Sequence, residues 1–217
     1  MPAYPSSPYN WIDGLPDRAR DALQRAMAPH LSRTGGDVYT PTTRARGLYR
    51  VLAGRAQMYV IGAQGQQILF RDFGPGETFG EVATLDLQNY PVFVSIDAGS
   101  SVGFVAHEQV TALSQVFPDI RRAVEAAVCQ YVRTLMAFLV SALTRNAQDR
   151  VHDRLVWLAD SRPGGRAAGP VRTTQADLAA MLGLSRQSVN EALAALEAGG
   201  RVRRSRGAID LTDAIVP

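Results

Sequence analysis

The chain has 217 residues, of which 46% are apolar and 20% charged, and its formal net charge is +3. This length allows one large or two small domains with a real hydrophobic core, and the composition excludes a disordered chain. All 23 basic residues are arginine, whose rigid fork of donors suits phosphate and guanine. The mild net charge does not by itself identify a nucleic-acid partner, but four arginines cluster near the C-terminus: Arg201, Arg203, Arg204 and Arg206.

Targeting signals and cysteine content bear on the compartment. The N-terminal residues contain no basic leader followed by an apolar run, which favours a cytoplasmic protein. The most apolar window, Thr134–Leu143, is far short of the roughly 20 residues that span a bilayer, so we expect no membrane partner. One cysteine, Cys129, excludes an internal disulfide and an iron–sulfur cluster held by this chain alone. Its apolar neighbours predict a buried, inert thiol.

The first region, residues 1–116, reads as a β-barrel domain with a short leading helix from Pro16 to Ala28. After this helix, short apolar runs alternate with glycine-containing turns, which is typical of an antiparallel barrel or jelly roll. The expected strands are Leu48–Leu52, Ala56–Ile61, Gln67–Phe70, Val92–Ile96 and Val102–Val105.

A long helix is expected next, from Pro118 to Asn146 within a segment of residues 117–146. Its apolar residues follow the alternating spacing of a coiled-coil seam, and the seam consists of Val124, Val128, Tyr131, Leu135, Phe138 and Ala142. Because the helix is apolar nearly all round from Leu135 to Leu143, it is expected to be buried on two sides, one of them by a second copy. The alternative is a helix packed only inside its own monomer.

The last region, residues 147–217, contains the most informative pattern. Thr174 is placed to cap a first helix together with Asp177, and Gly183 suits a tight turn. Ser185 then begins a second helix, 185–198, whose core face is expected to contain Val189, Leu193 and Leu196. Two short helices with a glycine in the turn between them predict a helix-turn-helix.

The second helix is the candidate recognition helix for the DNA major groove. Its exposed face carries side chains that pair with bases, namely Arg186, Gln187, Asn190 and Glu191. Hydroxyl groups near the helix starts suit phosphates, and they belong to Thr174, Ser185 and Ser188. A basic hairpin follows and predicts a wing that contacts the backbone through Arg203, Arg204 and Arg206. The alternative is a helical hairpin with a solvated charged face.

These motifs, with the order barrel, long helix and DNA-binding domain, resemble the cyclic-AMP receptor/FNR (CRP/FNR) family of bacterial transcription regulators. The resemblance rests on residues 183–190 with Leu196-Glu197, and on residues 73–81. It implies an α+β chain with an N-terminal cyclic-nucleotide-binding-like jelly roll, a dimerisation helix and a C-terminal winged helix-turn-helix. The implied partners are a second copy, an inverted-repeat operator in double-stranded DNA, and RNA polymerase. Gln187 and Glu191 depart from the cyclic-AMP branch and imply a different half-site.

The resemblance also marks an effector pocket at Gly80, Glu81 and Val82. In the cyclic-AMP branch the Gly-Glu pair holds the cyclic phosphate and the ribose, and an arginine followed by Ser or Thr stands ten residues after the Glu. Here Pro91 and Val92 stand in that place, which removes the expected cation and argues against ordinary cyclic-AMP binding. A cyclic-nucleotide-dependent regulator remains the alternative, with Arg71 as a substitute cation if its side chain points inward. The effector is otherwise unknown, and haem stays open.

An enzyme is the other class to weigh, since jelly rolls also host metal-dependent chemistry. The three histidines, His30, His107 and His152, are scattered, and none has a partner at ligand spacing. His152 is expected to be solvated. No nucleophile elbow, P-loop or dinucleotide motif occurs in the sequence, so we expect neither catalysis nor a metal site, and a jelly-roll metalloenzyme is the disfavoured alternative.

Overall fold

The computed structural model describes residues 9–62, 65, 67–160, 167 and 169–212. The chain divides into two compact units. The first contains most of the barrel and the long helix up to Thr134, and the second contains the rest of that helix with the C-terminal domain.

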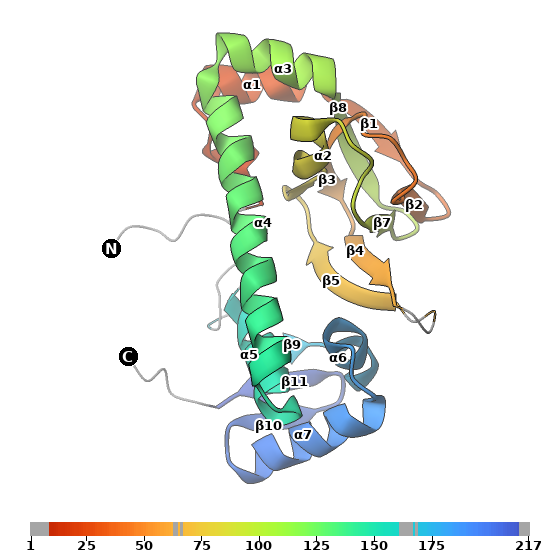
Figure 1. Ribbon diagram of the computed structural model, residues 1–217, viewed down its shortest axis with the longest axis vertical. Helices are drawn as coiled ribbons and strands as arrows, with labels where there is room; N and C mark the ends of the chain where they lie inside the picture. Colours follow the sequence, from red (N-terminus) through yellow and green to blue (C-terminus); the bar gives the residue numbers. More distant parts are fainter. Residues whose placement is uncertain (1–8, 63–64, 66, 161–166, 168, 213–217) are drawn as a thin grey trace. The chain divides into compact units, whose positions relative to one another are not determined.

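The barrel consists of two four-stranded sheets, which confirms the predicted antiparallel jelly roll (Figure 1). One sheet has the order β1-β8-β3-β6 and the other the order β2-β7-β4-β5. The paired strands include β8 antiparallel to both β1 and β3, and β7 antiparallel to both β2 and β4. Their bounds are β1 Ala28–Leu31, β2 Gly36–Tyr39, β3 Gly47–Ala53, β4 Ala56–Ile61, β5 Gln67–Phe73, β6 Thr78–Phe79, β7 Phe93–Ile96 and β8 Ser101–Ala106.

Three of these strands, β1, β2 and β6, were not expected from the sequence. They are two to four residues long, too short to show an alternating pattern. The side chains of β1 are all exposed, so no apolar period marks it. These strands form because longer neighbours, such as β8 beside β1, offer them hydrogen bonds.

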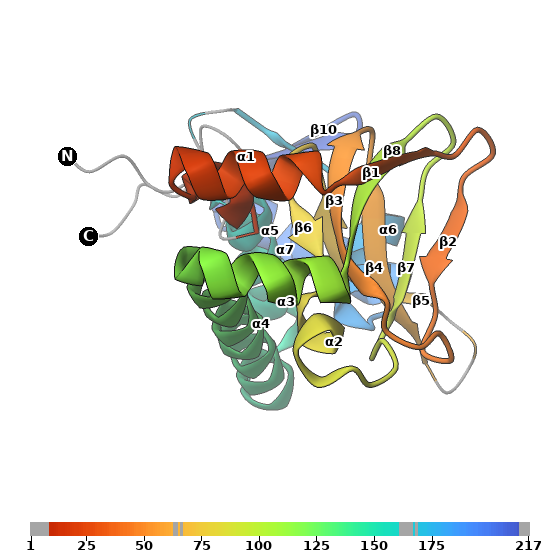
Figure 2. The ribbon, with the colours of Figure 1, turned by 90° about the horizontal axis from the view of Figure 1, so that it is seen from above.

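Short helices flank the barrel strands. They are η1 Trp11–Gly14, α1 Asp17–Arg25, α2 Glu81–Asp86 and α3 His107–Val116. The expected leading helix was too long at its C-terminal end, because Ala28 already belongs to β1. Figure 2 shows α1 lying beside α3. A largely aromatic core fills the barrel interior, and a second core joins α1, α3 and the first part of α4.

The long helix α4 runs from Pro118 to Thr144, and α5, Ala147–Asp160, follows it. The predicted seam of α4 was only partly right, because Val124 and Tyr131 face their own unit whereas Leu135 is exposed. Val124 is 1% exposed in the core of its own unit, and Tyr131 packs against the barrel core, so neither side chain is available to a second copy. The side chains on the outer face are 50% to 77% exposed, and we call them the α4 stripe: Val132, Leu135, Met136, Leu139, Val140 and Leu143.

By length and composition alone, α4 is also long and apolar enough to cross a membrane. An 18-residue window within it has a mean hydropathy of 1.5, and 6% of that window is buried. The expectation that the apolar part of this helix is far too short to span a bilayer was therefore wrong. The apolar segment extends well beyond the ten residues Thr134–Leu143. One such helix is weak evidence for a membrane.

Cys129 is exposed, so the expectation of a buried thiol was wrong. Burial on a helix depends on the face and not on the immediate sequence neighbours. Ala127, two positions earlier, faces the core, whereas Cys129 lies on the side of α4 that carries Val132 and Met136.

The second unit contains a winged helix-turn-helix, as predicted. The helices after α5 are α6 Gln175–Leu182 and α7 Arg186–Ala198, and the strands are β9 Val171–Arg172, β10 Val202–Ser205 and β11 Ala208–Leu211. The wing sheet has the order β10-β11-β9, in which β9 is a strand that the sequence did not indicate. The predicted core residues Val189, Leu193 and Leu196 are all 0% exposed.

Candidate DNA-binding surface and effector site

Local hydrogen bonds begin both helices of the helix-turn-helix. The Thr174 hydroxyl accepts from the Asp177 backbone N–H at 3.1 Å, and the Asp177 carboxylate accepts from the Thr174 N–H at 3.2 Å, which is the predicted capping box. Ser185 caps α7 through one such hydrogen bond, accepting from the Ser188 N–H at 3.0 Å. Gly183 ends α6 with φ of 62°, a left-handed conformation that favours glycine.

The predicted base-reading side chains of α7 are all exposed, and they are Arg186, Gln187, Asn190 and Glu191. Gln187 Nε2 donates to Glu191 Oε1 at 2.9 Å, so these two side chains form a polar pair one turn apart. Arg186 forms no ion pair within the described part of the chain. Its guanidinium therefore stands at the start of α7 with its donors available to a base edge or a phosphate.

The wing arginines differ in what they contact. Arg204 is tied to α7, because its Nε lies 2.6 Å from Glu197 Oε2 and its backbone N–H donates to Glu197 Oε1 at 2.9 Å. The backbone hydrogen bond, and to a smaller extent the side-chain hydrogen bond, lower the pKa of Glu197. Arg203 is 74% exposed and 3.7 Å from Asp210, and Arg206 is exposed. Arg204 thus holds the wing to α7, and Arg203 and Arg206 extend into solvent.

The expectation that His152 is solvated was wrong. It is 9% exposed on α5, and Arg201 Nη2 lies 2.9 Å from its Nδ1. Arg201 therefore joins the base of the wing to α5 within this unit.

In the first unit, α2 begins at the Gly-Glu pair that marks the expected effector pocket. Gly80 has φ of 96°, and a Cβ there would lie 3.2 Å from the Gly47 carbonyl oxygen, so a side chain at this position is strained. Glu81 is 0% exposed, and burial raises the pKa of its carboxyl group. Its oxygens accept from Trp11 Nε1 at 3.1 Å and from the Tyr131 hydroxyl at 3.5 Å.

Arg71 points inward, as the substitute-cation hypothesis requires. It is 6% exposed, and its Nη2 lies 2.5 Å from Glu77 Oε1. The guanidinium carbon lies 3.6 Å from the centre of the Tyr9 ring. Arg71 is thus a buried cation within the expected effector region, although Glu77 already balances its charge.

Aromatic side chains occupy the barrel interior beside Pro91, which stands at the position of the arginine in the cyclic-AMP branch. Pro91 is exposed, and the adjacent Tyr90 is 1% exposed and stacks on Tyr39 with ring centres 3.7 Å apart. The Tyr90 hydroxyl donates to the Gly47 carbonyl at 2.8 Å. Val82, which the sequence placed in the pocket, is 37% exposed and does not belong to this buried group.

Sequence reasoning missed Tyr9 and Trp11, which contact Arg71 and Glu81 respectively. Two aromatic residues ahead of the first helix carry no motif, and their partners are about 60 to 70 positions away, so no local signal indicates the contact.

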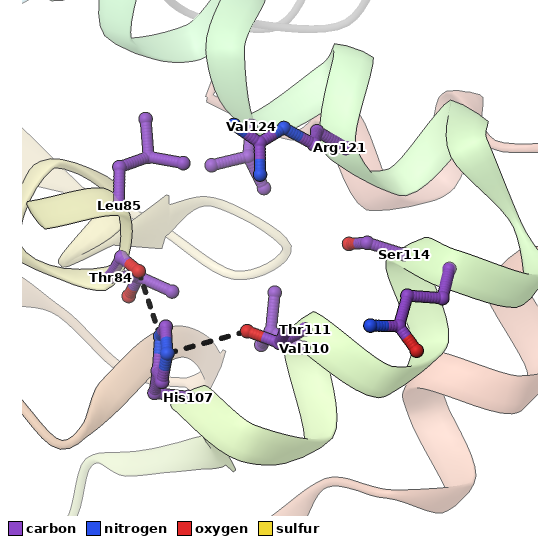
Figure 3. A pocket seen from close by; sticks show the side chains of 9 residues that line it. Thr84, Leu85, His107, Val110, Thr111, Ser114, Arg121 and Val124 are labelled. Carbon is purple, nitrogen blue, oxygen red and sulfur yellow. Dashed lines mark hydrogen bonds between the residues drawn. The ribbon is translucent and has the colours of Figure 1, made fainter.

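A separate crevice of about 180 Å³ lies between α2, α3 and α4 (Figure 3). His107 Nδ1 lies 2.8 Å from the Thr84 carbonyl oxygen and its Nε2 lies 3.3 Å from the Thr111 hydroxyl, so both ring nitrogens are engaged. Arg121 at its rim pairs with Glu125. Over the described residues, no group of three or more His, Cys, Asp or Glu side chains is placed to hold a metal ion.

A sensor-type jelly roll and a winged helix-turn-helix on one chain define the class of protein: a transcription regulator that carries its own sensor domain. Two family models match the chain, the cyclic nucleotide-binding domain at residues 33–116 and the Crp-like helix-turn-helix domain at residues 149–214. The chain belongs to the CRP/FNR family of transcription regulators.

Individual relatives agree with this assignment. The chain is 26% identical to the "Cyclic AMP receptor protein" of Thermus thermophilus, over 91% of this chain and 88% of that protein. It is 24% identical to the "CRP-like cAMP-activated global transcriptional regulator" of Mycobacterium tuberculosis, over 93% of this chain and 92% of that protein. In fold it is similar to FixK2 from Bradyrhizobium japonicum, with a TM-score of 0.71 and 19% identity over 86% of this chain and 93% of that chain. The chain is a DNA-binding regulator, and the metalloenzyme alternative is set aside.

Proposed function

We propose that this regulator acts in the cytoplasm as a homodimer that binds an inverted-repeat operator, with α7 in the major groove and the wing on the phosphate backbone. The observation that carries the proposal is the exposed row Arg186, Gln187, Asn190 and Glu191 on a helix whose opposite face is fully buried. Thr174, Ser185 and Ser188 are the proposed phosphate contacts near the starts of α6 and α7. RNA polymerase is the proposed partner once DNA is bound.

The α4 stripe supports the homodimer. Its residues recur at spacings of three and four, which is the pattern of a helix that pairs with another helix. Six large apolar side chains at least half exposed on one helix face are unfavourable in water and stable when a second copy covers them. Membrane insertion is the competing explanation, and it predicts recovery in the membrane fraction instead of a soluble dimer.

We infer further that operator binding does not require cyclic AMP. Pro91 and Val92 replace the family cation, and the stacked rings of Tyr39 and Tyr90 take up the neighbouring interior. A cyclic-nucleotide-dependent regulator is the second candidate. The inward-pointing Arg71 and the similarity to two relatives named for cyclic AMP favour it. For that candidate, the nucleotide phosphate has to displace Glu77 from Arg71.

The test is selection of DNA from a random pool by the purified protein with no additive, followed by affinity measurements with and without cyclic AMP. We expect one inverted repeat to be enriched, with half-sites about one helical turn apart. We also expect cyclic AMP to change its affinity less than threefold. Enrichment only in the presence of cyclic AMP supports the second candidate, and no enrichment under any condition refutes specific DNA binding.

Replacing both Arg203 and Arg206 by alanine should reduce the salt dependence of DNA binding. Each lost phosphate contact lowers the slope of log K against log salt concentration by roughly 1, with equal effects on operator and unrelated DNA. Affinities between low and moderate salt measure it. The control is the double replacement of Arg18 and Arg25, which are exposed on α1. This control removes the same charge and should leave the slope unchanged. An unchanged slope in the wing variant contradicts the backbone role of the wing.

A further inference from the structure

Residues 9–11 contact Arg71 and Glu81, the two buried ionisable side chains of the expected effector site. The Tyr9 ring is 2% exposed, with the Arg71 guanidinium 3.6 Å above it and the Tyr131 ring 4.7 Å away. Two residues later, the Trp11 indole donates to the buried carboxylate of Glu81. One short segment therefore contacts the strand β5, the start of α2 and the helix α4.

The segment is held in place at both ends. The Tyr9 carbonyl oxygen accepts from the Thr78 backbone N–H at 2.7 Å and from the Thr78 hydroxyl at 2.8 Å. Just beyond its other end, Asp13 Oδ1 lies 2.6 Å from Nη2 of the buried Arg50. Main-chain hydrogen bonds together with an ion pair indicate a built-in part of the domain, because an adventitious contact of a chain end lacks such anchors.

These contacts match what a small molecule at this site has to supply. A ligand here needs a hydrogen-bond donor for the Glu81 carboxylate in addition to the Tyr131 hydroxyl, since an under-satisfied buried carboxylate is unfavourable. It also needs a ring or an anion against Arg71 and a surface against α4 at Tyr131 and Thr134. Trp11 provides the donor, the Tyr9 ring lies against Arg71, and the Tyr9 hydroxyl is 3.4 Å from the Thr134 hydroxyl.

We propose that residues 9–11 are a tethered occupant of the effector site and stand in for a ligand, holding α2 and α4 in the DNA-binding state. The proposal rests on the proposed function, in that it takes Glu81 and Arg71 as the effector site. Because the occupant is covalently attached, its effective concentration is high and the site is filled without an additive. An external effector then acts only by displacing this segment.

The test uses the full chain with Trp11→Phe, which keeps an aromatic ring and removes the indole N–H that donates to Glu81. The matched control is Tyr59→Phe, which removes a 3.0 Å hydrogen bond to the Asp37 carboxylate elsewhere in the same barrel. Amide hydrogen exchange is the first measurement. We expect exchange in Trp11→Phe to be about tenfold faster over α2 and over residues 124–134, as follows from losing one hydrogen bond to a charged group. Tyr59→Phe should leave these segments unchanged.

Operator affinity is the second measurement, and it separates this proposal from the proposed function. We expect Trp11→Phe to bind the selected operator about tenfold more weakly, and Glu81→Gln to add no further loss in the double variant because the two side chains act as a pair. Unchanged exchange overturns the tethered occupant whether or not the protein binds DNA. Faster exchange with wild-type affinity overturns its role in DNA binding. If the wild-type protein selects no operator, the proposed function is refuted. The exchange measurement still decides whether residues 9–11 act as the occupant of the site.

Discussion

Arg186→Ala should weaken binding to the selected operator by about 1–3 kcal/mol and remove the preference at one base pair in each half-site. Arg186 is exposed at the first turn of α7 and forms no ion pair within the described chain, so its guanidinium fork is free to pair with a guanine. The loss corresponds to roughly 5- to 150-fold in affinity. Competition binding against single-base variants of the operator measures both the loss and the changed preference.

Arg186→Lys is the control, because it keeps the positive charge and loses the bidentate geometry. We expect the lysine variant to bind unrelated DNA as the wild type does and to discriminate as poorly as the alanine variant at that one base pair. If both variants lose the same factor on every sequence, Arg186 contacts a phosphate, and the assignment of the guanine contact is wrong.

The double replacement Leu135→Glu with Leu139→Glu should convert the homodimer into monomers. Both side chains are about half exposed on the α4 stripe, and in the proposed dimer each substitution places an unpaired carboxylate in an apolar seam. We expect the dissociation constant of the dimer to rise on the order of 100-fold or more, which corresponds to about 3 kcal/mol. Light scattering measures the mass, and operator binding should fall because a monomer engages only one half-site.

Ala137→Glu is the control, since it introduces a carboxylate at an exposed position of α4 that lies outside the stripe. This variant should remain a dimer. A wild-type mass equal to one chain contradicts the homodimer. A dimer that survives the double replacement places the interface elsewhere. Recovery of the wild type in membranes supports the alternative of a membrane helix.

The DNA-binding domain was predictable in detail because its determinants are local. Thr174 and Ser185 cap helices through partners three residues away, and Gly183 provides the one left-handed residue of the turn. The spacing of Val189, Leu193 and Leu196 sets the core face of α7 without reference to any other element. The contact between Arg204 and Glu197 was not predictable, since the direction of a wing side chain depends on how the hairpin packs against α7.

The barrel was less predictable, and the predicted seam of α4 wrongly included Val124 and Tyr131. Its residues are apolar nearly all round between Leu135 and Leu143, so several seams fit the sequence equally well. The packing of Val124 and Tyr131 against their own unit leaves Leu139 and its neighbours on the outer face. Periodicity identifies an amphipathic helix, but only its neighbours select the face.

The sequence by itself determined the order of the domains, the caps and turn of the helix-turn-helix, and the loss of the family cation at Pro91. These properties depend on residue identity or on hydrogen bonds within one turn of helix. Only the tertiary structure decided which side chains meet the buried Glu81 and Arg71, and which face of α4 stays exposed. The physical reason is that a buried charge takes its partner from whatever segment the fold brings near it. Here that segment contains Tyr9 and Trp11, far away in the sequence from both charges.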